Sequence, residues 1–183
     1  DRAGPLLAPL VAWAHAVGAE TASLRPFLCL MLLSLARAAP LADEHVAALA
    51  PVLQDTPPAF FETYADFFGT VIGQFVGAVA SAPSLRALLD ALAAVLPASQ
   101  PLAQLLARRI DLLETLVRLP CFAPEHAQAI TTVLCQTYRV ASQAQHFPEY
   151  TRLLIDAYQR IIAWSAADPD TEYLVASVQT LSL

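Results

Sequence analysis

The sequence contains no lysine and no asparagine, and only five of its 183 residues are glycine. So few glycines argue against a barrel of short strands with glycine-rich turns, and the lack of any polar low-complexity tract excludes a disordered linker. Charged residues make up 14% of the chain, whereas 57% is hydrophobic. A chain of this length and composition can bury a core of its own, and we expect a single domain over residues 1–183.

Motifs that carry catalysis or hold a cofactor are also missing. The sequence has no GxSxG, HExxH, phosphate-binding GxxxxGK[ST] or dinucleotide-binding glycine pattern. Cys121, His126, Cys135 and His146 lack the tightly spaced ligand pair that closes a zinc site. Glu125 and His126 are adjacent, and adjacent residues on a helix point about 100° apart, which makes a poor acid–base pair. We therefore expect a protein that is not an enzyme and that has no metal and no cofactor.

Acidic residues outnumber basic ones. Sixteen acids against ten arginines give a net charge of −6. This excess opposes the approach of a phosphate backbone, so we do not expect nucleic acid as a partner. Five acids lie between Arg37 and Arg86 with no cation among them, and they form either an acidic binding face or an ordinary solvated surface. They are Asp43, Glu44, Asp55, Glu62 and Asp66.

The C-terminal half offers arginines in place of acids. Arg108, Arg109 and Arg139 could bind an acidic peptide or a phosphate. Most charges here, however, have an opposite charge about one turn away, as Arg108 has in Asp111 and Glu114 has in Arg118. This pairing favours solvated helix faces over an anion site.

The cysteines indicate the compartment. Cys29, Cys121 and Cys135 are odd in number and lie in apolar segments, which is typical of reduced cysteines buried as small hydrophobic residues. No signal-peptide pattern opens the chain. We therefore predict an intracellular protein, either cytoplasmic or nuclear. Met31 is the only methionine, and the chain does not begin with one, so we expect a piece of a larger protein.

Apolar residues recur three and four positions apart along nearly the whole chain, which predicts an all-α fold. Prolines mark most of the helix starts, where a missing N–H costs no hydrogen bond. The connections are short, so consecutive helices should be antiparallel. We predict nine helices, at residues 5–17, 23–38, 41–54, 58–81, 84–96, 101–119, 124–144, 148–166 and 169–182.

Taken in pairs, these helices form four hairpins and a C-terminal helix, and the hairpins begin near positions 5, 41, 84 and 124. Two helices in about forty residues is the period of HEAT and armadillo repeats. Segment 83–96 resembles a HEAT inner helix, with Arg86 and Asp90 one turn apart beside a stripe of alanine and leucine. The resemblance implies an α-solenoid whose concave face holds protein partners, as in nuclear transport receptors and assembly scaffolds.

A compact multi-helix bundle is the alternative fold. Helix 23–38 is apolar nearly all round, and such a helix must be covered on several sides. Neighbouring repeats in a stack would cover it, and so would the centre of a bundle. Periodicity does not choose between the two.

The most specific local pattern is a glycine stripe on helix 58–81. Gly69, Gly73 and Gly77 are spaced by four, and each costs the helix about 1 kcal/mol relative to alanine. The stripe therefore predicts the close approach of another helix, from the same fold, from a second copy or in a membrane. The uncharged run 67–85 is long enough to span a bilayer, but polar residues and a proline dilute it, so a membrane is the least favoured of the three.

Aromatic residues gather on the same helix as the acids. At helical spacing they more often form core, but exposed ones would anchor a protein partner, because aromatic residues dominate interface hot spots. Two functions follow: a protein–protein interaction scaffold or adaptor, or a bundle that oligomerises or contacts membranes through the glycine helix. A third, an all-α enzyme or a carrier of an apolar ligand, has no positive evidence in the sequence. The candidate partner-binding residues are Phe60, Phe61, Glu62, Tyr64, Asp66 and Phe68.

Overall fold

The computed structural model describes residues 25–38, 41–141 and 147–167, together with positions 9, 10, 12, 13 and 16. Every regular element in these residues is a helix, as the apolar periodicity predicts. The predicted helix 169–182 lies outside the described residues. Most of the predicted helix 5–17 also lies outside them, and its five described positions are helical.

Nine α-helices follow one another in the described residues, joined by short connections. They are α2 (Arg25–Ala38), α3 (Asp43–Leu49), α4 (Pro58–Thr63), α5 (Ala65–Ala78), α6 (Ala82–Val95), α7 (Gln100–Arg108), α8 (Ile110–Arg118), α9 (Ala127–Ala141) and α10 (Phe147–Ala167). Three short 3-10 helices adjoin them: η1 (Ala50–Leu53) continues α3, η2 (Leu96–Ala98) continues α6, and η3 (Pro124–His126) leads into α9.

Prolines and serines start these helices. Pro58 and Pro83 occupy one of the first two helical positions of α4 and α6, where the missing N–H would have no partner in any case. Ser81 and Ser99 cap α6 and α7 by accepting a backbone N–H of the first turn. The predicted helix starts are therefore close to the observed ones.

Two of the predicted helices are each broken in two. The predicted helix 58–81 breaks at Tyr64, with φ −123° and ψ 38°, and the predicted helix 101–119 breaks at Arg109, with φ −111° and ψ 54°. Neither residue is proline or glycine. No local residue preference therefore indicates the breaks.

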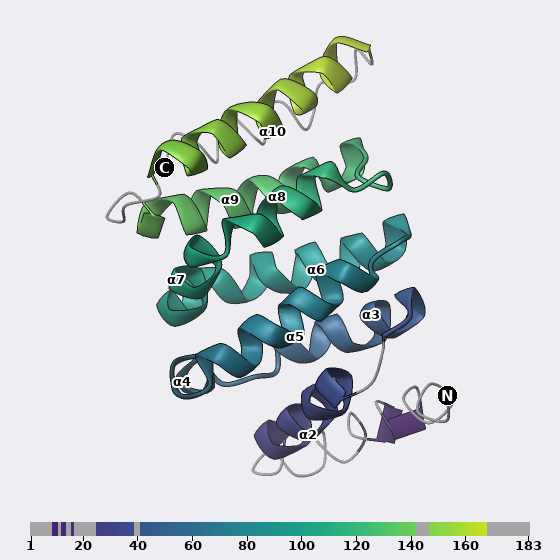
Figure 1. Ribbon diagram of the computed structural model, residues 1–183. Coiled ribbons are helices and arrows are strands. Elements are labelled where there is room, and N and C mark those ends of the chain that lie inside the picture. Colours follow the sequence, from purple (N-terminus) through teal and green to yellow (C-terminus); the bar gives the residue numbers. More distant parts are fainter. Residues whose placement is uncertain are drawn as a thin grey trace.

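The helices form two sets that each follow chain order (Figure 1). In one set, α3 contacts α6 and α6 contacts α9. In the other, α2 contacts α5, α5 contacts α7 and α8, and α8 contacts α10. Helices α2 and α10 lie at opposite ends of the described chain in Figure 1. The buried hydrophobic side chains form one cluster to which every helix from α2 to α10 contributes.

Helix α2 is not covered on all sides, contrary to the expectation for segment 23–38. Leu32, Leu33 and Ala36 are buried against the rest of the fold. Phe27 and Met31 are exposed, and Leu35 is exposed one further turn along the same face. The apolar residues of this helix therefore divide into a packed face and an open one.

Candidate functional site

Phe61 and Phe68 belong to the core, so their prediction as partner-binding residues is wrong. They are 1% and 0% exposed, and their ring centroids lie 4.5 Å apart. Both side chains point inward, one on each side of the break at Tyr64. Phe60 is half-buried and meets Tyr64 edge to face at 5.9 Å. Tyr64 itself is 46% exposed.

The two acids among the candidates remain available at the surface. Glu62 on α4 and Asp66 on α5 are both exposed. In the part of the chain that the structure describes, neither carboxylate has a hydrogen bond or an ion pair. Only the backbone carbonyl of Asp66 is engaged, by a hydrogen bond from Thr70 Oγ1 at 2.9 Å.

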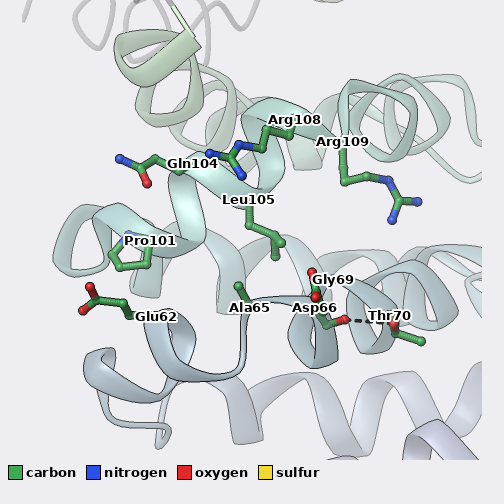
Figure 2. Close-up of a pocket in the computed structure, with 10 residues that line it drawn as sticks. All are labelled: Glu62, Ala65, Asp66, Gly69, Thr70, Pro101, Gln104, Leu105, Arg108 and Arg109. Atoms are coloured by element: carbon green, nitrogen blue, oxygen red, sulfur yellow. Dashed lines mark hydrogen bonds between the residues drawn. The ribbon is translucent and has the colours of Figure 1, made fainter. Parts of the chain in front are cut away.

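A groove of about 450 Å³ lies beside these acids, between α4–α5 and α7 (Figure 2). We call it the first groove. In Figure 2, Leu105 projects into the gap between the two walls. One wall consists of Glu62, Ala65, Asp66, Gly69 and Thr70, and the other of Pro101, Gln104, Leu105, Arg108 and Arg109.

Gly69 is the most tightly packed of the three glycines in the stripe. A Cβ added to Gly69 would lie 3.2 Å from Cδ1 of Leu105. At Gly73 the nearest atom, Cδ2 of Leu112, would lie at an ordinary 3.8 Å, and at Gly77 no atom would lie within 4 Å. The predicted stripe is therefore not one continuous contact. It packs tightly inside the fold at Gly69 and faces open space at Gly77.

Charges of opposite sign line the two walls of the first groove. Glu62 and Asp66 are on the α4–α5 wall, and Arg108 and Arg109 are on the other. In the described residues, no ion pair joins the acids to the arginines. The groove thus presents separated charges of both signs to whatever enters it.

Arg109, and not Arg108, pairs with Asp111, which corrects the predicted pairing. Nε and Nη2 of Arg109 donate to the two carboxylate oxygens of Asp111 at 3.0 and 2.9 Å. These hydrogen bonds lower the pKa of Asp111 below its usual value and raise the pKa of Arg109. The reason is the break at Arg109, which lets its side chain bond to the first turn of α8. Arg108 has no ion pair or hydrogen bond within the described residues.

A second groove of the same volume, about 450 Å³, lies between α8 and α10. Arg118 in this groove pairs with Glu114 at 2.6 Å, as predicted. Arg160 donates a hydrogen bond to the carbonyl oxygen of Val117. The arginines of the second groove are therefore already engaged within the chain. The remaining member of the predicted anion site, Arg139, lies on α9 away from both grooves.

Asp43 connects the N-terminus of α3 to that of α6. Its Oδ1 accepts the backbone N–H of Ala80 at 2.6 Å and of Ser81 at 3.0 Å, and its Oδ2 accepts the hydroxyl of Ser81 at 2.5 Å. Desolvation alone would raise the pKa of Asp43, but the hydrogen bonds from Ser81 and Ala80 outweigh it and lower the pKa. Asp43 thus belongs to a structural contact and not to an acidic binding face.

His126 makes the corresponding connection between α6 and α9. Its Nε2 lies 3.2 Å from the carbonyl oxygen of Ala82, at the start of α6. Arg86 of α6 donates in return to the carbonyl oxygen of Glu125 at 3.1 Å. His126 is fully buried and its ring is bonded to backbone groups, so it serves packing.

His45 and His126 also make the same local hydrogen bond. In each, Nδ1 accepts the backbone N–H three residues earlier, from Ala42 at 3.0 Å and from Ala123 at 3.1 Å. Both histidines end a sequence Ala-x-Glu-His, and the two copies are roughly two forty-residue periods apart. This short repeat is a signal in the sequence that apolar periodicity overlooks.

The cysteines and histidines considered as zinc ligands show no metal site in the described residues. Cys29, Cys121 and Cys135 form no disulfide within the described residues, and burial raises the pKa of the Cys121 and Cys135 thiols. No group of three or more histidine, cysteine or acidic side chains could hold a metal ion in the described ranges, and His146 lies outside them.

Membrane contact was considered for the glycine helix. Of the helices that the structure describes, none has both the length and the apolar character needed to cross a membrane.

In comparisons with known proteins, no family model, curated protein or solved structure matches this chain.

Proposed function

We propose that this chain is a segment of a HEAT-like α-solenoid within a larger protein, and that it acts as a non-enzymatic scaffold or adaptor for protein–protein interaction. One observation carries this function. The helices α3, α6 and α9 contact one another in chain order, and their N-termini are joined by the bonds of Asp43 and His126. In a closed bundle, the first and last helices would instead share a common centre.

An open stack favours binding because it leaves long side surfaces uncovered. The spaces between successive helices of one set then become grooves, and the first and second grooves are examples in the described residues. The first groove contains Glu62 and Asp66 from the predicted partner-binding set. It also has walls from two helices, which is how repeat stacks build extended binding surfaces.

The function is tested by selecting short random peptides, displayed on phage, against the purified chain. A helical protein of similar size and net charge serves as the control. Enriched peptides are synthesised with a fluorescent label, and their affinity is measured by anisotropy. We expect peptides that bind the chain in a saturable manner and not the control. If selection enriches no peptide above the control, the proposed function is wrong.

The alternative function is oligomerisation or membrane contact through the glycine helix. Only the open space at Gly77 favours it, because the Gly69 end of the stripe is already filled by Leu105. A Gly77→Leu substitution separates the two functions. Loss of a dimer in analytical ultracentrifugation, or loss of co-sedimentation with anionic liposomes, supports the alternative. If the wild type and Gly77→Leu are both monomers and neither co-sediments with the liposomes, the scaffold is supported.

A further inference from the structure

The first groove contains charges that the fold itself leaves uncompensated. Glu62, Asp66 and Arg108 are exposed, and none of them has a polar partner in the described residues. Glu62 and Asp66 lie on the same wall and give it a negative charge. A cationic group of a ligand would be attracted to this wall.

The charge of Arg109 is already compensated within the chain. Nε and Nη2 of its guanidinium donate to the Asp111 carboxylate, which balances the positive charge and holds the side chain at the edge of the groove. The uncompensated charges are thus two acids on one wall and the single Arg108 on the other. A phosphate group alone would meet two repelling carboxylates, whereas a ligand with both signs of charge would match both walls.

Small and apolar residues lie between the charged side chains of the groove. Ala65 presents only a methyl group, and Leu105 packs against Gly69. The exposed amide of Gln104 can donate to and accept from a peptide backbone. A volume of about 450 Å³ is within the range of about 300–1,000 Å³ found for ligand pockets, which suits a few side chains of an extended segment.

We propose that the first groove binds an extended peptide segment of a protein partner that carries a basic and an acidic side chain. The basic side chain lies against the wall of Glu62 and Asp66, and the acidic side chain lies against Arg108 on the other wall. This partner chemistry rests on the proposed function, because it specifies which peptides such a module takes. The second groove is the poorer site, since its arginines already bond within the chain.

The test repeats the peptide selection with two variants, Glu62→Lys and Arg108→Glu. Both side chains are exposed and unbonded, so we expect both variants to keep the circular dichroism spectrum and melting temperature of the wild type. Asp156→Lys, in the second groove, and Arg152→Glu, outside both grooves, are the matched controls of equal charge change.

We expect the wild type to enrich peptides that combine lysine or arginine with an acid. Glu62→Lys weakens binding of these peptides by about fivefold or more, because it removes an attraction and adds a repulsion. A peptide with its basic residue changed to glutamate recovers affinity for Glu62→Lys. Arg108→Glu weakens binding in the same way, and reversing the charge of the acidic residue of the peptide recovers affinity for this variant. Both control variants bind the peptides as the wild type does.

Three results would overturn this assignment. Peptides that bind the wild type and both groove variants equally would place the site elsewhere and leave the proposed function standing. Weakening by Asp156→Lys alone would place the site in the second groove. If the wild type enriches no peptide at all, both the groove assignment and the proposed function fall.

Discussion

Gly69 and Gly77 share a helix and a spacing but not an environment. The space that a Cβ would occupy at Gly69 is limited by Cδ1 of Leu105 at 3.2 Å, whereas at Gly77 it is empty to 4 Å. A side chain at Gly69 would therefore crowd Leu105 of α7, whereas one at Gly77 would meet no neighbour within 4 Å.

Substitution by alanine should separate these two glycines. We expect Gly77→Ala to raise the free energy of unfolding by about 0.5–1 kcal/mol, because alanine favours the helix and restricts the unfolded chain. Gly69→Ala should gain less or lose stability, since Leu105 must move by a few tenths of an ångström. Urea unfolding measures both, and in a Leu105→Ala background the two substitutions should become alike. Equal stabilisation in the wild-type background would contradict the assigned contact.

At the residue scale, the sequence predicts the kind of residue at the site better than its role. Glu62 and Asp66 are correctly placed at the surface by their charge. Phe61 and Phe68 are predicted to bind a partner but are buried, because aromatic spacing alone is the same for a core and for an anchor. Arg109 takes the acid expected for Arg108, since the choice depends on the break in the helix.

At the scale of elements, Asp43 joins two helices that are distant in sequence. Its carboxylate accepts hydrogen bonds from Ala80 and Ser81 in the connection before α6. Bonds to a charged group contribute more to stability than bonds between neutral groups. The side chain of the neighbouring Glu44 is 83% exposed, and its Oε1 lies 3.8 Å from Nε2 of His45. Glu44 is therefore a matched control for Asp43 in the same helical turn.

We expect Asp43→Ala to lower the free energy of unfolding by about 1.5–3 kcal/mol at neutral pH. Glu44→Ala should change it by no more than about 0.5 kcal/mol, because an exposed acid near a histidine contributes little. Both values come from urea unfolding of otherwise identical proteins. Similar losses for the two variants would mean that the hydrogen bonds of Asp43 do not connect α3 to α6.

The stability that Asp43 supplies should depend on pH. The pKa of Asp43 is lowered below its ordinary value of 3.8 in the folded protein, so the unfolded chain binds the proton more readily. The stability that Asp43 supplies is fully present well above pH 3.8 and is lost as the pH falls through the folded pKa. The difference between wild type and Asp43→Ala should therefore shrink in acid.

Helix starts were predictable and helix breaks were not. Pro58 and Pro83 restrict their own backbone, so their effect can be predicted without the rest of the fold. Tyr64 and Arg109 have no such restriction, so no local residue preference marks the breaks at these two residues. The first groove lies between these broken helices. Some of its residues could therefore be predicted from the sequence, but not that they line one groove.

At the scale of the whole molecule, the all-α class followed from apolar periodicity, but the order of packing did not. A stack and a bundle bury the same face of each helix, so the same spacing fits both. The repeated Ala-x-Glu-His sequence at His45 and His126 is more informative. It places the same hydrogen bond at the start of two helices that both pack against α6.

The arrangement is checked by the distance between the first and last described helices. Spin labels at Ser34 on α2 and Gln159 on α10 are carried by a bioorthogonal amino acid, which leaves the three cysteines intact. Three helix-to-helix steps of 8–10 Å predict a separation of roughly 25–30 Å. Labels at Thr115 on α8 and Gln159, one step apart, are the control. A Ser34–Gln159 distance as short as the control would indicate a closed bundle.

Helix α6 rests on α3 along one side and on α9 along the other. In the proposed stack, each unit draws its stability from the units immediately before and after it and not from a shared centre. A gene duplication or deletion that adds or removes one whole unit would then alter the length of the protein without rebuilding its interior. New grooves could arise in this way while the older ones keep their shape.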